Sequence, residues 1–222
     1  MNLLRRNELP EHLKVDIKSI NEERANMLSH GLGVLLFLAL IPFLISYAAK
    51  TGMAVYLVSV ILYSISLLMV YTASTLYHSS YDAKYRRRLK IFDHVSIYFL
   101  IAGTYSPFIL THLRTTAGWV IFIVLWSMVV IGSIVKLFHV EKFKLISTLA
   151  YLVMGWLVIF IIKPLYLLLP EVSFYWILIG GVSYTAGVFF YLKESIRYNH
   201  LVWHLFVLGG SVSHFVAVYF CV

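Results

Sequence analysis

The sequence predicts an all-α fold: a polytopic membrane protein built as a bundle of seven transmembrane helices. Hydrophobic residues make up 61% of the 222 residues, and charged residues make up only 13%, about half of the ~25% that soluble domains carry. Seven stretches contain no Asp, Glu, Lys or Arg, and each is long enough to cross the hydrocarbon core, which takes roughly 20 helical residues. This composition excludes a soluble globular domain, a disordered chain and a coiled coil.

The seven stretches predict the helices in chain order. They cover residues 25–49, 51–81, 94–113, 115–135, 145–162, 172–192 and 198–222. The second is the longest, but it is too short for two crossings and a turn. An open sheet is excluded because lipid cannot satisfy its backbone edges, and no ten-residue alternating pattern indicates a β-barrel. We expect Lys163 and Pro164 to end the fifth helix near the outer interface.

The polar and basic segment before the first stretch, residues 1–24, is expected to form a cytoplasmic tail. Because it leads into a full-length apolar run, we expect a signal anchor rather than a cleaved secretory peptide. Residues 25–222 are expected to form a single membrane domain.

Lysine and arginine are distributed unevenly between the two ends of the predicted helices. Only Lys50, Arg114 and Lys163 fall on one side. The other fifteen fall on the opposite side: Arg5, Arg6, Lys14, Lys18, Arg24, Lys84, Arg86, Arg87, Arg88, Lys90, Lys136, Lys142, Lys144, Lys193 and Arg197. Since positive loops face the cytoplasm, the N-terminus is predicted inside and the C-terminus outside. The net charge of +8 is thus a signal of topology, and no nucleic-acid partner is expected.

Histidine is the main chemical resource of this sequence. The single cysteine, Cys221, permits neither an internal disulfide nor a cysteine metal site, whereas nine histidines are present. His78 lies near the end of the second predicted helix, and His200 and His204 share one face at the beginning of the seventh. The predicted orientation places all three at cytoplasmic helix ends. Three neutral imidazoles with an open position are the ligand set of a catalytic zinc site, so we predict that these three bind zinc.

Two further polar residues are expected beside this metal site. Asp93, at the start of the third predicted helix, is the only carboxylate expected within a span, and Ser74 lies one turn before His78. Asp93 is either a fourth ligand or an acceptor that orients an imidazole or a zinc-bound water, and Ser74 can hydrogen-bond that water or a substrate oxygen. The alternative is that the histidines are ordinary interfacial residues and that Asp93 only favours the positive end of a helix dipole.

Three other histidines are expected outside the ligand set. His30 lies at the same level and either supports a ligand or packs between helices, and packing is the favoured interpretation. His94 is rotated by about 100° from Asp93 and is expected to face a different neighbour. His214 lies ~15 Å beyond His204 and is expected to be a hydrogen-bonded packing residue near the middle of the bilayer.

At these positions the chain resembles the progestin and adipoQ receptor family, most closely its bacterial haemolysin III-like branch. The resemblance rests on Ser74-x3-His78, Asp93 and His200-x3-His204, supported by residues 21–33 (NEERANMLSHGLG), 92–107 (FDHVSIYFLIAGTYSP) and 208–215 (LGGSVSHF). It covers essentially the whole chain and implies a seven-helix protein of the bacterial inner membrane with its N-terminus inside. It also implies a zinc ion held by His78, His200 and His204, with Asp93 and Ser74 beside the metal-bound water.

The resemblance implies membrane lipids as partners and a wider superfamily of membrane hydrolases that includes alkaline ceramidases. One hypothesis is therefore a zinc-dependent hydrolase of a lipid amide or ester, in which Asp93 acts as general base or positions the water. A second is a non-enzymatic membrane-homeostasis or receptor-like protein in which zinc ties helices together. A third is a cytolysin or pore, as the family name suggests, although the spans lack the polar stripe that a pore needs. The identity of the lipid, the protein partners and the oligomeric state are left open.

Overall fold

The computed structural model describes residues 20–221, and these residues form helices joined by short loops. The elements are α1 (Ile20–Lys50), α2 (Ala54–Ser79), α3 (Ala83–His112), α4 (Thr116–His139), α5 (Lys144–Trp156), the 3-10 helix η3 (Leu157–Ile161), α6 (Ile162–Leu168), α7 (Glu171–Leu192) and α8 (Asn199–Tyr219). Seven segments are long and apolar enough to cross a membrane, since α5, η3 and α6 together make one crossing. The predicted seven-helix membrane protein is confirmed.

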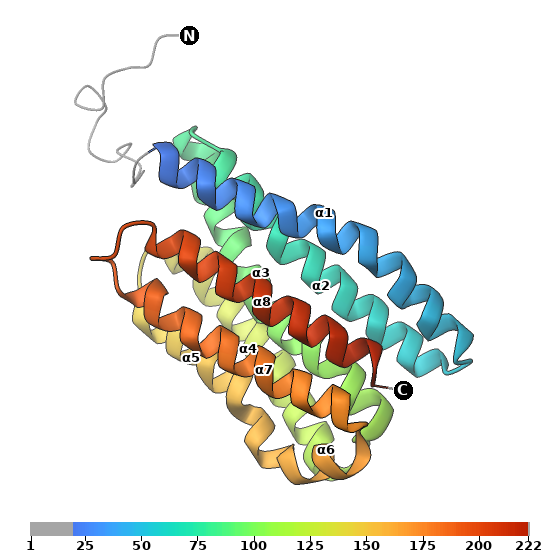
Figure 1. Ribbon diagram of the computed structural model, residues 1–222. Coiled ribbons are helices and arrows are strands. Elements are labelled where there is room, and N and C mark those ends of the chain that lie inside the picture. Colours follow the sequence, from blue (N-terminus) through green and yellow to red (C-terminus); the bar gives the residue numbers. More distant parts are fainter. Residues whose placement is uncertain (1–19, 222) are drawn as a thin grey trace, which may run out of the picture.

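The helices lie side by side in one bundle, and successive crossings run in opposite directions (Figure 1). As a result, the start of α1, the end of α2, the start of α3 and the start of α8 meet at the same end of the bundle. We call this the N-terminal end. Which end faces the cytoplasm stays a prediction from the charge distribution. Most of the predicted tail, residues 1–24, lies outside the described residues.

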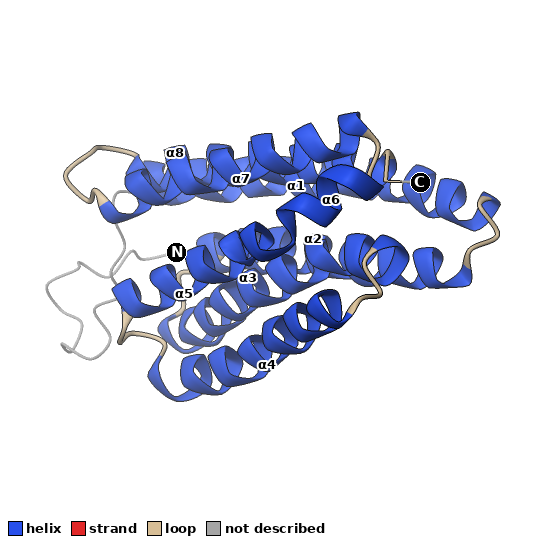
Figure 2. Ribbon diagram, turned by 90° about the horizontal axis from the view of Figure 1, so that it is seen from below, coloured by secondary structure: helices blue, strands red, loops and turns tan. Residues whose placement is uncertain are grey.

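Helix α3 occupies the middle of the bundle, where it contacts α2, α4, α5, α6 and α8. Helix α8 packs between α7 and α1, and Figure 2 shows these three helices together on the side of the bundle away from α4. This arrangement matters for the site described below. It places the beginnings of α1, α3 and α8 and the end of α2 around one space.

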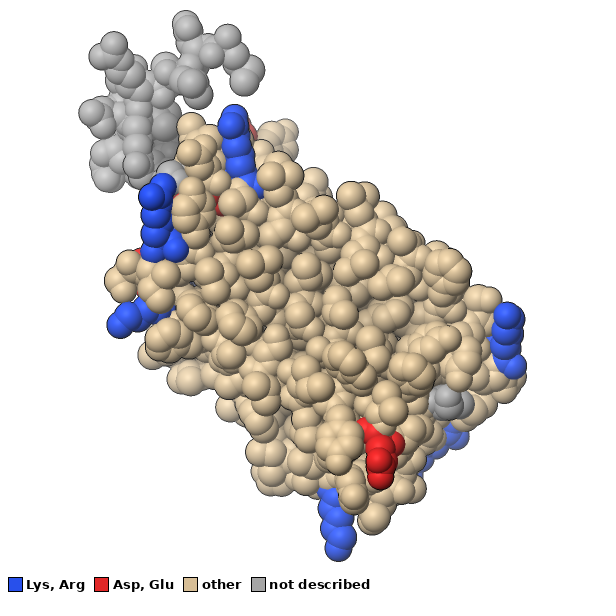
Figure 3. Space-filling model, in the orientation of Figure 1, with Lys and Arg blue, Asp and Glu red and all other residues tan. Residues whose placement is uncertain are grey.

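The surface of the bundle is apolar between its two ends. In Figure 3 the charged side chains gather at the ends of the visible face and leave an uncharged band between them. Large side chains such as Leu32, Phe43, Val130 and Phe160 are more than half exposed. In water such a surface would drive aggregation, whereas in a bilayer it is the face that contacts lipid.

Small residues allow α7 and α8 to approach each other closely. A Cβ added to Gly180 would lie 2.2 Å from the ring of His214, and one added to Gly210 would lie 2.8 Å from the ring of Tyr184. Glycines at such contacts let aromatic side chains lie against the backbone, which is the usual basis of close helix packing in membranes. His214 itself donates from Nε2 to the carbonyl of Ile177 at 3.1 Å, as expected for a packing residue.

The fifth crossing is a broken helix that Tyr105 of α3 supports. The Tyr105 hydroxyl donates to the carbonyl of Gly155 at 2.7 Å and accepts from the backbone N–H of Val158 at 2.9 Å. A hydroxyl can do both, so it satisfies backbone groups that the 3-10 segment leaves without helical partners.

Proline does not end this crossing where the sequence predicted. The helix continues past Lys163 and Pro164 to Leu168, because Pro164 lies in the first turn of α6. At that position proline has no backbone hydrogen bond to lose, and its fixed φ suits a helix start.

Candidate metal centre

Three histidines from two helices meet at the N-terminal end of the bundle. His78 comes from the last turn of α2, and His200 and His204 come from the first turns of α8. Their candidate ligand nitrogens all lie within 4.8 Å of one another, and the group can hold a metal ion. The ring centroids are 5.0 Å apart for His78 and His200, 5.1 Å for His78 and His204, and 4.6 Å for His200 and His204. The predicted convergence of these three residues is confirmed.

The hydrogen bond to Glu23 determines which nitrogen of His78 carries a proton. His78 Nδ1 lies 2.8 Å from Glu23 Oε2, and both side chains are almost completely buried. A carboxylate can only accept, so Nδ1 carries the proton and Nε2 keeps its lone pair. His78 Nε2 is buried and has no hydrogen-bond partner among the described residues. An imidazole with one nitrogen bonded to a carboxylate and the other free is arranged as metal-ligating histidines are.

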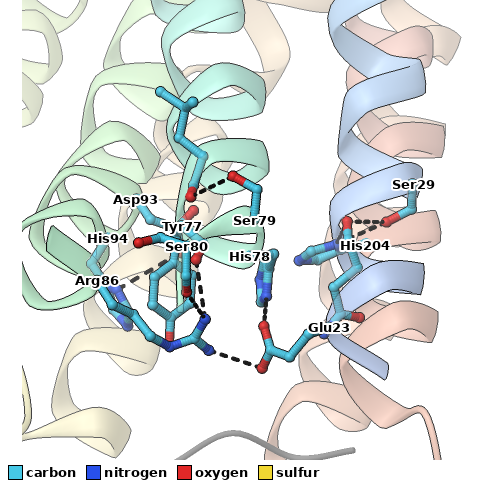
Figure 4. A network of polar contacts seen from close by, with 12 residues as sticks. Glu23, Ser29, Tyr77, His78, Ser79, Ser80, Arg86, Asp93, His94 and His204 are labelled. Atoms are coloured by element: carbon cyan, nitrogen blue, oxygen red, sulfur yellow. Dashed lines mark hydrogen bonds and ion pairs between the residues drawn. The ribbon is translucent and has the colours of Figure 1, made fainter. Parts of the chain in front are cut away.

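His204 is oriented in the same way by α1. Its Nδ1 lies 2.9 Å from Ser29 Oγ and 3.2 Å from the carbonyl oxygen of Asn26. The Ser29 hydroxyl donates its only proton to the Asn26 carbonyl at 2.8 Å. His204 Nδ1 must therefore be the donor in both of its contacts. The lone pair of Nε2 is therefore available. Figure 4 shows His78 and His204 next to each other, held from below and from the side by Glu23 and Ser29.

His30 covers the far face of His204. The two rings are stacked with centroids 3.6 Å apart and an angle of 16° between them. The ring of Tyr71 then packs edge-on against His30, with centroids 4.9 Å apart. His30 thus restrains a candidate ligand by packing, which combines the two roles considered for it from the sequence.

The buried carboxylate of Glu23 is shared with Arg86, at the start of α3. Arg86 Nη2 donates to Glu23 Oε1 at 2.9 Å. Its Nη1 donates to the carbonyls of Tyr77 and Ser80 at 3.1 and 2.9 Å, which satisfies carbonyls at the end of α2. The Arg86 guanidinium therefore joins α1, α2 and α3 beside the histidine cluster, which it reaches through Glu23.

Ser74 and Asp93 lie beside the cluster but not in the group of ligand atoms. Ser74 is buried one turn before His78, and its hydroxyl lies next to the Asp93 carboxylate without a well-formed hydrogen bond among the described residues. Asp93 and His94 both line the cavity that the histidines face, and their side chains approach to 3.9 Å. The expectation that His94 faces a different neighbour from Asp93 is therefore wrong, although the hydrogen bond of His94 Nδ1 goes to the carbonyl of Lys90, at 2.8 Å in its own helix.

A cavity of about 590 Å³ opens from the histidine cluster into the bundle. Along α3 it is lined from Asp93 to Phe108, a rise of roughly 22 Å at 1.5 Å per residue. Its deep part is largely apolar, with side chains such as Leu100, Ile161 and Ile177. The cluster therefore lies at the polar end of a long cavity that is mostly hydrocarbon in character.

Glu23 corrects one expectation from the sequence. Asp93 is not the only carboxylate within a span, because Glu23 belongs to the membrane-length helix α1 and is only 3% exposed. The criterion of a charge-free stretch began the first span after Arg24 and so left Glu23 outside. The sequence does contain a pattern that extends the first helix back to Glu23, since Glu23, Asn26 and His30 are spaced to share one face of a helix.

Comparisons with known proteins show what this chain is similar to. A family profile described as "Haemolysin-III related" matches residues 18–215. The chain is 44% identical over 205 residues to the hemolysin-3 homolog of Bacillus subtilis (strain 168), an alignment that covers 92% of this chain and 96% of that protein. It is 43% identical over 203 residues to hemolysin-3 of Bacillus cereus, covering 91% and 93%. The human monocyte to macrophage differentiation factor is 28% identical over 170 residues, covering 71% and 68%.

Proposed function

Because this seven-helix chain belongs to the haemolysin-III-related family of membrane proteins, we propose that it binds zinc and hydrolyses an amide or ester bond of a membrane lipid. The observation that carries the proposal is the arrangement of His78 and His204. In both residues Nδ1 donates a hydrogen bond to a group of α1, which leaves Nε2 free to bind a metal. Both lie at the polar end of an apolar cavity.

The donor set suits zinc. Three neutral imidazole nitrogens from His78, His200 and His204 leave one position open, which is the pattern of catalytic rather than structural zinc sites. When bound, zinc supplies a Lewis acid for the scissile carbonyl and makes water nucleophilic at neutral pH. The carboxylate of Glu23, which accepts from His78, would support the basicity of that ligand, and the Ser29 hydroxyl and Asn26 carbonyl would do the same for His204.

The residues beside the cluster would handle the protons. In hydrolysis the water oxygen joins the carbonyl carbon, the bond from that carbon to nitrogen or oxygen breaks, and a water proton ends on the leaving group. Asp93 would accept that proton and return it to the leaving group. The unpartnered Ser74 hydroxyl would donate to the carbonyl oxygen as negative charge develops on it, or orient the water.

The cavity would hold the acyl chain of the substrate. Its volume lies within the range of roughly 300–1,000 Å³ that small-molecule sites occupy, and its length follows α3 toward the opposite end of the bundle. With the predicted orientation, the reaction would take place near the cytoplasmic leaflet.

Metal analysis of the purified protein tests the first half of this proposal. We expect about one zinc per chain in the wild type and little in His200→Ala and His204→Ala. A wild-type protein that carries no near-stoichiometric zinc would contradict the proposal.

Turnover tests the second half. Wild-type protein supplied with ceramides and phospholipids should release fatty acid in a zinc-dependent manner, and Asp93→Asn should keep its zinc but lose most of this activity. A zinc-loaded protein that hydrolyses none of these lipids would argue against catalysis.

A second candidate function is a non-enzymatic membrane protein with structural zinc. It is favoured by the network in which Glu23 and Arg86 join α1, α2 and α3 below the cluster, because a metal would extend that network to α8. If zinc is only structural, the Asp93→Asn protein should keep both its zinc and its effect in cells. Removal of zinc by a chelator should lower the thermal stability of the wild-type protein. Loss of the cellular effect in Asp93→Asn would oppose it.

A further inference from the structure

Lys136 is a buried lysine that the metal site does not use. It lies in the last turn of α4 and is only 1% exposed. Among the described residues it makes no hydrogen bond and no ion pair, although it lines the same cavity as the histidine cluster. A lysine near a helix end normally extends its ammonium group into the headgroup region. Lys136 is covered instead, and its side chain lines the cavity.

The packing of α4 on α3 places Lys136 at the level of the candidate metal centre. Gly132 lies against Tyr98 of α3, where an added Cβ would be 2.4 Å from the Tyr98 ring. Lys136 is one turn beyond Gly132, and His94 is one turn before Tyr98 on the antiparallel helix. Each step is about 6 Å toward the N-terminal end of the bundle. Lys136 and His94 therefore lie at about the same depth in the cavity wall.

Four of the other charged residues that line this mouth of the cavity form two lysine–glutamate pairs, and Asp93 lines it as well. Lys90 donates to Glu141 at 2.5 Å, and Lys144 donates to Glu194. In each pair the lysine belongs to a helix and the glutamate to the turn that follows another helix, and both pairs are partly exposed. Lys90 holds Glu141, the carboxylate nearest to Lys136 in the sequence, so Glu141 attracts the Lys136 ammonium only from a distance. No hydrogen bond or ion pair joins Lys136 to a carboxylate among the described residues.

An unpaired ammonium group removed from water is costly unless an anion joins it. The cavity offers space for such an anion beside an apolar region. We propose that Lys136 binds the anionic group, a carboxylate or a phosphate, of a lipid whose hydrocarbon chain occupies the cavity. This deepens the proposed function by naming an anionic lipid as the substrate class, and only the turnover of that lipid rests on the proposed hydrolysis.

The test is direct binding to chelator-treated, full-length protein in phosphatidylcholine nanodiscs. The probe is radiolabelled hexadecyl phosphate, with hexadecanol as the neutral analogue and inorganic phosphate as the free anion. We expect Lys136→Met to weaken binding of hexadecyl phosphate roughly tenfold or more, the scale of one lost hydrogen bond to a charged group. Hexadecanol should bind both proteins equally, and millimolar inorganic phosphate should not displace the probe.

Lys142→Met is the matched control, because it removes one positive charge from the exposed loop that follows α4. Lys142→Met should bind the probe as the wild type does, and Lys136→Arg should retain most of the affinity. Lys136→Gln serves as a second variant if Lys136→Met is poorly folded.

Three results would overturn the proposal: equal binding by the Lys136 variants, an equal loss in Lys142→Met, or displacement of the probe by inorganic phosphate. Because zinc is absent, binding is scored independently of hydrolysis. Binding that depends on Lys136 without turnover would oppose the hydrolase alone.

Discussion

Glu23→Gln isolates the contribution of one buried carboxylate to metal binding. In the wild type, Glu23 accepts from His78 Nδ1 at 2.8 Å and from Arg86 at 2.9 Å, and it is 3% exposed. Glutamine keeps one acceptor oxygen but loses the charge, so the proton on His78 Nδ1 is held less firmly and His78 Nε2 becomes a weaker ligand. Loss of such an outer partner costs about 10–100-fold in metal affinity, or ~1.4–2.7 kcal/mol. We expect about tenfold for Glu23→Gln and nearer a hundredfold for Glu23→Ala.

The same substitution should affect stability through Arg86. Removing one member of a buried ion pair typically costs ~3–5 kcal/mol, because the other charge is left uncompensated. Here Arg86 keeps its bonds to the carbonyls of Tyr77 and Ser80, so we expect a loss near or below the lower end of that range. The thermal midpoint of the metal-free protein measures this effect separately from metal affinity.

The assay is titration of metal-free protein with cobalt(II), followed by competition with zinc and a chromophoric chelator. The cobalt spectrum reports the ligand geometry, which a purely structural role of Glu23 would leave unchanged. Glu22→Gln is the matched control, since Glu22 accepts from the backbone of Tyr198 and glutamine can still do so. If Glu23→Gln binds zinc within twofold of the wild type, or loses no more affinity than Glu22→Gln, the assigned role of Glu23 is refuted.

Three further predictions address the surroundings of the cluster. Ser29→Ala should weaken metal binding only a few-fold, because the lost bond is neutral and the Asn26 carbonyl still lies 3.2 Å from His204 Nδ1; the same cobalt titration measures it. Gly33→Ala should lower the thermal midpoint by an amount equivalent to ~1–3 kcal/mol, since its Cβ would lie 2.3 Å from the Tyr71 ring. Gly31→Ala, in the same helix, is the control: its Cβ would meet nothing closer than 3.7 Å, so the substitution should be tolerated. Purified protein in planar bilayers should show no discrete conductance, because the deep part of the cavity is largely apolar, and reproducible unitary currents would revive the pore hypothesis.

The sequence predicted the fold well because a bilayer leaves few alternatives. Every described crossing corresponds to one charge-free stretch, since lipid forces the backbone to satisfy itself within each helix. The convergence of His78 with His200 and His204 was also predictable. It needed only the number of crossings, which determines the end of the bundle at which each helix starts, and the four-residue spacing on α8.

The partners of these histidines were harder to predict, because they depend on which helices are neighbours. His204 is oriented by Ser29 and Asn26 of α1, a helix at the other end of the chain. Nothing in the order of the crossings shows that α1 packs against α8. The proton positions that make the cluster suitable for a metal therefore followed only from the packed bundle.

Two charged residues lie elsewhere in the structure than the sequence predicts, and both for the same reason. Glu23 was assigned to a tail and Lys136 to a loop, because each span was taken to end at the first charge. In the structure both belong to membrane-length helices, and both are almost completely buried. A charge at the edge of a span is inexpensive only while it reaches water. Where packing covers it, its cost must be offset by a partner: Glu23 has Arg86 and His78, and for Lys136 we propose the ligand. Charges next to predicted spans are thus the first residues to examine for function in a protein of this kind.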